Sequence, residues 1–89
     1  MSVCKELEIK NRKGLHARAA AAFVKTAESF NSEIQVERVG QKVSGCSIMG
    51  LMMLAASQGT SIKVTATGDD EQQAMDAISS LVDNKFGEE

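Results

Sequence analysis

The chain has 89 residues, of which 43% are hydrophobic and 25% are charged, and its formal net charge at pH 7 is -2. This length predicts a single domain over residues 1–89 with one modest core. The composition is typical of a soluble globular protein, and no apolar run approaches the roughly 20 residues that a membrane-spanning helix needs. No signal-peptide pattern is present, so we expect a cytoplasmic protein. With three phenylalanines as its only aromatic residues, the chain lacks the features of a nucleic-acid-binding protein.

The charges are distributed unevenly along the chain. Residues 1–18 contain five basic and two acidic side chains, a net charge of +3, whereas residues 64–89 contain one basic and seven acidic side chains, a net charge of -6. Such a charge dipole would orient the protein toward a partner with a negatively charged site. Cys4 and Cys46 lie in separate segments without metal-ligand spacing, so we expect free thiols and no metal site.

In the first half of the chain, residues 3–9 alternate apolar and charged side chains and predict a half-buried strand. Lys5 interrupts the alternation, which favours a strand near the edge of a sheet. Residues 17–30 place apolar side chains at 20, 23, 24, 27 and 30, the spacing of a helix with one buried face. Asn31 and Ser32 then predict the end of this helix.

In the second half, residues 33–37 alternate again, and Val39-Gly40-Gln41 predicts a tight turn into a short strand that ends near residue 43. Ser47 is expected to cap a short helix over residues 48–54, and residues 62–66 predict a fourth strand. A last helix should follow Gly68, with its apolar stripe at residues 74, 77, 78, 81 and 82 and with Phe86 closing the core.

This order of elements, β-α-β-β-α-β-α, predicts an α+β fold. Its amphipathic helices and half-apolar strands can bury their apolar faces together in a four-stranded antiparallel sheet with three helices on one face and solvent on the other.

The segment that carries the chemistry is Gly14-Leu15-His16-Ala17-Arg18, between the first strand and the first helix. The first turn of a helix offers amide hydrogens and a partial positive charge to an anion, and the Arg18 guanidinium could reach the same anion. His16 is the sole histidine, and the small residues after it leave the imidazole accessible. An ordinary solvated or capping histidine is the alternative reading of the same position.

Two segments resemble one known family. Residues 11–18, Asn-Arg-Lys-Gly-Leu-His-Ala-Arg, are similar to the active-site segment of HPr, the histidine-containing phosphocarrier family of the bacterial phosphotransferase system. Residues 47–52, Ser-Ile-Met-Gly-Leu-Met, resemble the regulatory-serine segment of the same family, and the resemblance extends from about Val3 to Phe86. The family commonly has proline after the active-site arginine, whereas this chain has Ala19, which suits a first helical turn equally well.

The resemblance implies an open-faced β-sandwich and a phosphocarrier rather than an enzyme. His16 would accept a phosphoryl group on Nδ1 from a phosphoenolpyruvate-dependent enzyme I and pass it to an EIIA-type acceptor. Arg18 and the backbone amides of Ala17 and Arg18 would stabilise the phosphate. The resemblance implies no cofactor and no metal, and we expect a monomer. It leaves open whether the pathway is sugar uptake or a regulatory phosphorelay.

The resemblance also gives a second reading to Ser47 and to the short helix. Ser47 would be a regulatory phosphorylation site for an HPr kinase/phosphorylase, although its role as a helix cap would explain it equally well. Ile48, Met49, Leu51 and Met52 would form a docking surface for partners, whereas the alternative is that these side chains fill the core.

Two other function classes remain open at this point. A small acylphosphatase-like hydrolase would also bind phosphate through an arginine, but it would leave His16 without a role. A ferredoxin-like regulatory ligand-binding domain would require neither His16 nor Arg18.

Overall fold

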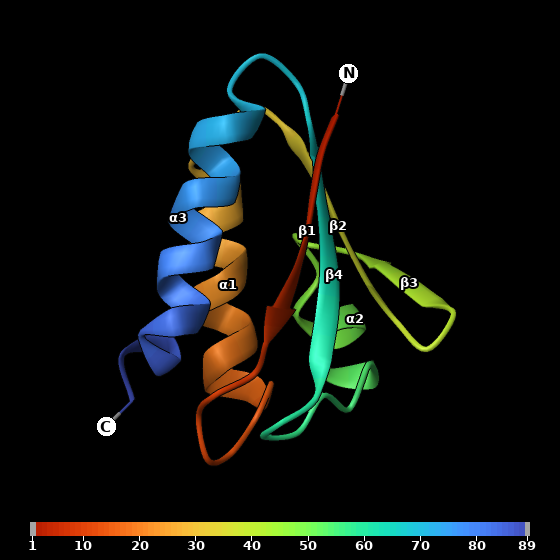
Figure 1. The fold of residues 1–89 in the computed structure, drawn as a ribbon, viewed down its shortest axis with the longest axis vertical. Coiled ribbons are helices and arrows are strands. Elements are labelled where there is room, and N and C mark those ends of the chain that lie inside the picture. Colours follow the sequence, from red (N-terminus) through yellow and green to blue (C-terminus); the bar gives the residue numbers. More distant parts are fainter. Residues whose placement is uncertain (1, 89) are drawn as a thin grey trace.

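Four strands and three helices follow one another in the predicted order in the computed structural model, which describes residues 2–88 (Figure 1). The elements are β1 (Ser2–Glu8), α1 (Ala17–Glu28), β2 (Glu33–Arg38), β3 (Gln41–Ser44), α2 (Ile48–Met53), β4 (Ser61–Thr67) and α3 (Glu71–Asp83). A short turn of 3-10 helix over Lys85–Gly87, which the periodicity did not predict, follows α3.

The sheet is antiparallel, with strand order β1-β4-β2-β3, so β1 lies at an edge as its interrupted alternation predicts. Helices α1 and α3 lie side by side against the same face of the sheet (Figure 1). The register brings the apolar side chains of neighbouring strands together on that face, because Val36 is paired with Val64 on one side and with Val43 on the other. The predicted α+β fold is therefore confirmed.

The opposite face of the sheet carries polar side chains. One row across all four strands alternates in charge, through Glu6, Lys63, Glu37 and Lys42, which are neighbours in the strand register. Each pair of opposite charges on adjacent strands stabilises the sheet by about 0.2–1 kcal/mol. This face therefore needs no covering helix.

The predicted hairpin joins β2 to β3 through the two residues Val39 and Gly40. Both have positive φ, 50° and 78° respectively, which is the conformation of a type I′ turn and matches the twist of the flanking strands. Val39 is 87% exposed, so a β-branched residue holds a left-handed conformation without support from the core.

The core lies between the helices and the sheet and is lined from α1 by Ala20, Phe23, Val24 and Ala27, as the helical spacing predicts. Phe30, the last position of the predicted stripe, lies beyond the end of α1 and is only partly buried. In α3 the buried stripe differs from the prediction. Met75 is buried, while Ala77 and Leu81 are only partly buried. The buried face of α3 consists of Ala74, Met75, Ile78, Ser79 and Val82. Phe86 is buried, as expected, and packs against the same core.

Within residues 2–88, no helix combines the length and the apolar character that crossing a membrane would require.

Candidate functional site

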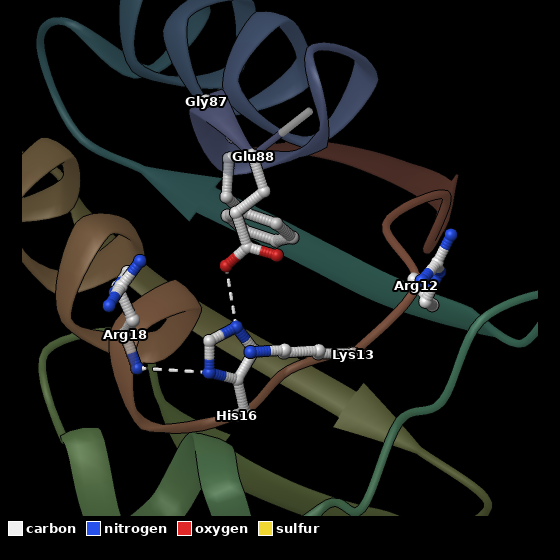
Figure 2. A pocket seen from close by; sticks show the side chains of 7 residues that line it. Arg12, Lys13, His16, Arg18, Gly87 and Glu88 are labelled. Carbon is white, nitrogen blue, oxygen red and sulfur yellow. Dashed lines mark hydrogen bonds and ion pairs between the residues drawn. The ribbon is translucent and has the colours of Figure 1, made fainter.

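His16 lies at the N-cap of α1, where the sequence places it. Its backbone is extended, with φ -83° and ψ -175°, and its carbonyl oxygen accepts the first helical hydrogen bond from the amide of Ala20. The imidazole turns back over the first turn, so that Nδ1 accepts a hydrogen bond of 3.3 Å from the backbone N–H of Arg18 (Figure 2). The side chain is 28% exposed, so the ring remains partly accessible to a partner.

Gly14 allows the loop before His16 to reach this position. Its φ is 69°, and a Cβ built on it would lie 2.5 Å from the carbonyl oxygen of Ala56. The next amide, that of Leu15, donates to the same carbonyl at 2.9 Å. Glycine is therefore required both for the left-handed backbone and for the close approach of the two loops.

The other ring nitrogen of His16 meets a carboxylate from the far end of the chain. Nε2 lies 2.5 Å from Oε2 of Glu88, across a sequence separation of 72 residues (Figure 2). The second carboxylate oxygen accepts a hydrogen bond of 3.0 Å from Nδ2 of Asn11, a fully buried residue whose amide also donates to the carbonyl of Gly14 at 2.7 Å. The sequence placed Asn11 in the active-site segment without assigning it a role, and it did not identify Glu88, for which the acidic charge of the last residues was the one signal.

Several contacts hold the Glu88 carboxylate in its ionised form. Partial desolvation favours a higher pKa, but the hydrogen bonds from Asn11 and His16, together with the positive charge of the nearby Arg18 guanidinium, outweigh it. The pKa of Glu88 is therefore lower than its ordinary value.

The backbone that delivers Glu88 to this place is strained. Lys85 and Phe86 have φ of 58° and 57°, and Gly87 follows with φ 78°. A left-handed conformation costs a residue other than glycine about 1–2 kcal/mol. The burial of Phe86 and the contacts of Glu88 with His16 and Asn11 offset this cost.

These groups surround a hollow of about 430 Å³ that opens beside the imidazole. It is lined by Arg12, Lys13, His16, Arg18, Phe86, Gly87 and Glu88. Three cationic side chains against one carboxylate make the hollow suited to an anion such as a phosphoryl group. Among residues 2–88 there is no group of three His, Cys, Asp or Glu side chains arranged to hold a metal ion, and Cys4 and Cys46 are free and exposed.

Ser47 caps α2 as predicted. Its Oγ accepts a hydrogen bond of 2.9 Å from the amide of Gly50, and its carbonyl accepts from the amide of Leu51 at 3.0 Å. The side chain is partly exposed. Helix α2 packs beside α1, so the serine and the histidine belong to neighbouring helices.

The apolar side chains of α2 divide into an exposed group and a buried one. The exposed group, which we call the α2 patch, consists of Ile48 (41% exposed), Met49 (74%), Met52 (41%) and Met53 (65%). Leu51 is fully buried, so the prediction that it contributes to a docking surface is wrong. A helix of six residues turns one position toward the core, and Leu51 occupies it.

Comparison with known proteins identifies the family. Residues 3–84 match the family PTS-HPr, described as the PTS HPr component phosphorylation site. The phosphocarrier protein HPr of Xylella fastidiosa is 49% identical over 84 residues, which cover 94% of each chain. The structure of HPr-C-His from Thermoanaerobacter tengcongensis is 52% identical, covers 98% of both chains and superposes with a TM-score of 0.93. A structure described as an HPr dimer from the same organism is 54% identical over 92% of this chain and 94% of that one, with a TM-score of 0.78.

The chain therefore belongs to the HPr family of phosphocarrier proteins of the phosphotransferase system. Members of this class carry phosphoryl groups and are not enzymes. The comparisons do not favour the acylphosphatase-like or ferredoxin-like alternatives.

Proposed function

We propose that His16 accepts a phosphoryl group from enzyme I and transfers it to an EIIA-type acceptor. The observation that carries this proposal is the position of Nδ1, which accepts the Arg18 amide at the start of α1 and so must hold a lone pair there. A phosphoryl group on Nδ1 would lie at the helix N-terminus, where the amides of Ala17 and Arg18 can stabilise it.

The transfer step needs no proton from this chain. The Nδ1 lone pair of His16 attacks phosphorus on the phosphohistidine of enzyme I and forms a new N–P bond. The N–P bond of the donor breaks, and its electron pair returns to the donor nitrogen. The Arg18 guanidinium, which lines the same hollow, neutralises charge on the transferring oxygens. The protein acts as a stoichiometric reactant and needs no cofactor.

We further propose that partners dock on the α2 patch. Its methionines are flexible and apolar, and such surfaces adapt to more than one partner. Ile48, Met49 and Met52 were expected to dock from the resemblance, and the exposed Met53 extends the same surface. Enzyme I and the EIIA-type acceptor would use this surface in turn, because both must reach His16.

Phosphorylation of Ser47 by an HPr kinase/phosphorylase is the regulation we propose. A phosphate at this N-cap would add close to two negative charges next to the α2 patch, while its own oxygens would face the amides of the first turn of α2. It would therefore repel acidic partners without unfolding the domain. We expect phosphorylated Ser47 protein to take up phosphoryl groups more slowly, with partial relief by salt and no loss of melting temperature. Unchanged uptake or a lowered melting temperature would contradict this mechanism.

The central experiment measures intact mass after incubation with phosphoenolpyruvate and enzyme I. We expect an acid-labile gain of one phosphate in the natural chain and none in His16→Ala. A gain that persists in His16→Ala would assign the acceptor to another residue. Ser80→Ala, on the exposed side of α3, serves as a control that should be phosphorylated normally.

We also propose that the protein acts as a cytoplasmic monomer. Light scattering after size-exclusion chromatography tests the monomer, and a mass of twice the 9.5 kDa chain would contradict it.

A further inference from the structure

We infer that the turn Lys85–Glu88 is a carboxylate clamp that holds His16 in the tautomer with a free lone pair on Nδ1. Glu88 is then a positioning residue, since it acts through the imidazole and not on the phosphoryl group. This inference rests on the proposed function of His16 and assigns a role to a residue that the active-site motif does not include.

The hydrogen bonds on the two ring nitrogens define the tautomer. The backbone N–H of Arg18 can only donate, so Nδ1 must accept and carries no hydrogen. An ionised carboxylate can only accept, so Nε2, which faces Glu88 at 2.5 Å, must carry the hydrogen. The two contacts select the same tautomer, and together they also fix the rotation of the ring.

Asn11 holds the carboxylate in the correct place. It is fully buried, and its Nδ2 is shared between Glu88 and the carbonyl of Gly14, while its Oδ1 has no hydrogen-bond partner among the described residues. A flipped amide would point this oxygen at two acceptors, so the observed orientation is the one that can be satisfied. The loop before His16 and the turn after α3 are thus joined through one buried side chain.

The path of the backbone indicates that the contact is built into the fold. Phe86 is anchored in the core, and three successive residues with positive φ turn the chain so that Glu88 points back at α1. The burial of Phe86 and the contacts of Glu88 with His16 and Asn11 together hold this strained path.

The clamp also stabilises the product of transfer. When Nδ1 bonds to phosphorus, the ring gains positive charge while Nε2 keeps its hydrogen. The carboxylate lies on the Nε2 side of the ring, away from the new phosphoryl group. It therefore compensates the positive charge of the ring and repels the phosphoryl oxygens less than a carboxylate on the Nδ1 side would. An orienting carboxylate plays the corresponding role for the histidine of many hydrolases.

The experiment compares the natural chain with Glu88→Ala and with Glu28→Ala, which removes the same charge at the far end of α1. Long-range 1H–15N spectra of the imidazole, recorded at about pH 8 where a histidine is ordinarily neutral, report the tautomer without any phosphoryl donor. We expect well-separated Nδ1 and Nε2 shifts in the natural chain and in Glu28→Ala. In Glu88→Ala the two shifts should move toward each other, and the rate constant for phosphoryl uptake should fall by about tenfold or more, with KM for enzyme I unchanged.

Glu88→Gln keeps the size of the side chain, so it tests the clamp even if Glu88→Ala loosens the turn. Its single amide oxygen can accept from Nε2 or from Asn11, but not as well from both, so we expect an intermediate tautomer shift and an intermediate rate. Unchanged shifts in both variants, or uptake as fast as in the natural chain, would overturn the clamp. If the natural chain takes up no phosphoryl group, the proposed function fails while the spectra still decide whether Glu88 selects the tautomer.

Discussion

The N-termini of α1 and α2 use the same local device in different surroundings. In each, the N-cap side chain accepts a backbone amide of the first turn, through Nδ1 of His16 in α1 and through Oγ of Ser47 in α2. The α1 cap lies in a hollow lined by three cationic side chains, and its Nε2 contacts the Glu88 carboxylate. The α2 cap lies beside exposed methionines, and no charged residue occurs in the first or the last turn of its helix.

This comparison shows that capping alone does not distinguish a reactive group from a structural one. A nucleophile needs a defined lone pair and nearby positive charge, and among the described residues the α1 cap combines both. The α2 cap has a hydroxyl next to the α2 patch, where we propose that a kinase modifies it. The two sites therefore fit the two kinds of phosphorylation that we propose, direct transfer at His16 and modification by a kinase at Ser47.

The largest effect should come from removing the cation at the α1 cap. Arg18→Ala is expected to slow phosphoryl uptake by roughly two orders of magnitude, because one charge-stabilising donor contributes about 3 kcal/mol to a transition state of this kind. Rapid-quench kinetics with phosphorylated enzyme I measure the rate. Lys25→Ala, in the last turn of the same helix, is the charge-matched control, and equal rates for the two variants would remove Arg18 from the mechanism.

The next effect concerns the surface beside the α2 cap. Met49→Glu should raise the Kd for enzyme I by roughly tenfold while the melting temperature stays nearly unchanged, because Met49 is 74% exposed. Met75→Glu places the same charge in the core and should cost several kcal/mol of stability. Calorimetric titration and thermal melting together test the pair. If Met49→Glu binds as tightly as the natural chain, docking lies elsewhere.

A smaller effect is expected from the α2 cap itself. Ser47→Ala removes the acceptor for the Gly50 amide and should lower the free energy of unfolding by about 1 kcal/mol. Ser80→Ala, at an exposed position in the interior of α3, should change it by less than about 0.5 kcal/mol. Urea denaturation measures both variants. A Ser47→Ala protein as stable as the natural one would mean that the hydroxyl does not serve the fold.

At the N-terminus of α3, the cap residue bonds to a different part of the chain. Asp70 precedes α3 but makes no capping bond there; its carboxylate accepts instead from the Ser32 hydroxyl and from the amides of Asn31 and Ser32. The Ser32 hydroxyl, followed by the Asn31 amide, holds the pKa of Asp70 below its ordinary value of 3.8. A depressed pKa means that the ionised group stabilises the fold above pH 3.8 and that this contribution is lost as the pH falls through the lower, folded-state pKa.

Asp70→Asn should therefore melt at a lower temperature than the natural chain at neutral pH, and the difference should disappear in acid. Melting curves between neutral pH and about pH 2 measure this difference in melting temperature. Asp69→Asn, at the exposed neighbouring position, should melt at the same temperature as the natural chain. A difference for Asp70→Asn that stays constant with pH would mean that the Asp70 charge does not contribute to stability.

Local features of this protein could be predicted from its sequence because they depend on neighbouring residues. Alternation predicted three of the strands, the turn at Val39-Gly40-Gln41 predicted the fourth, and helical spacing predicted the buried face of α1. The positions of His16 and Ser47 as caps followed in the same way, because a cap bonds to an amide only two or three residues further along the chain.

Only the tertiary structure decided which distant side chains complete the site. Glu88 reaches His16 because α3 packs beside α1 and the left-handed turn after α3 directs the chain back toward His16. No periodicity encodes such a contact, since it depends on the relative placement of two helices. The burial of Leu51 beneath the α2 patch was decided in the same way, because an almost wholly apolar helix of six residues has no polar face to show which side meets the core.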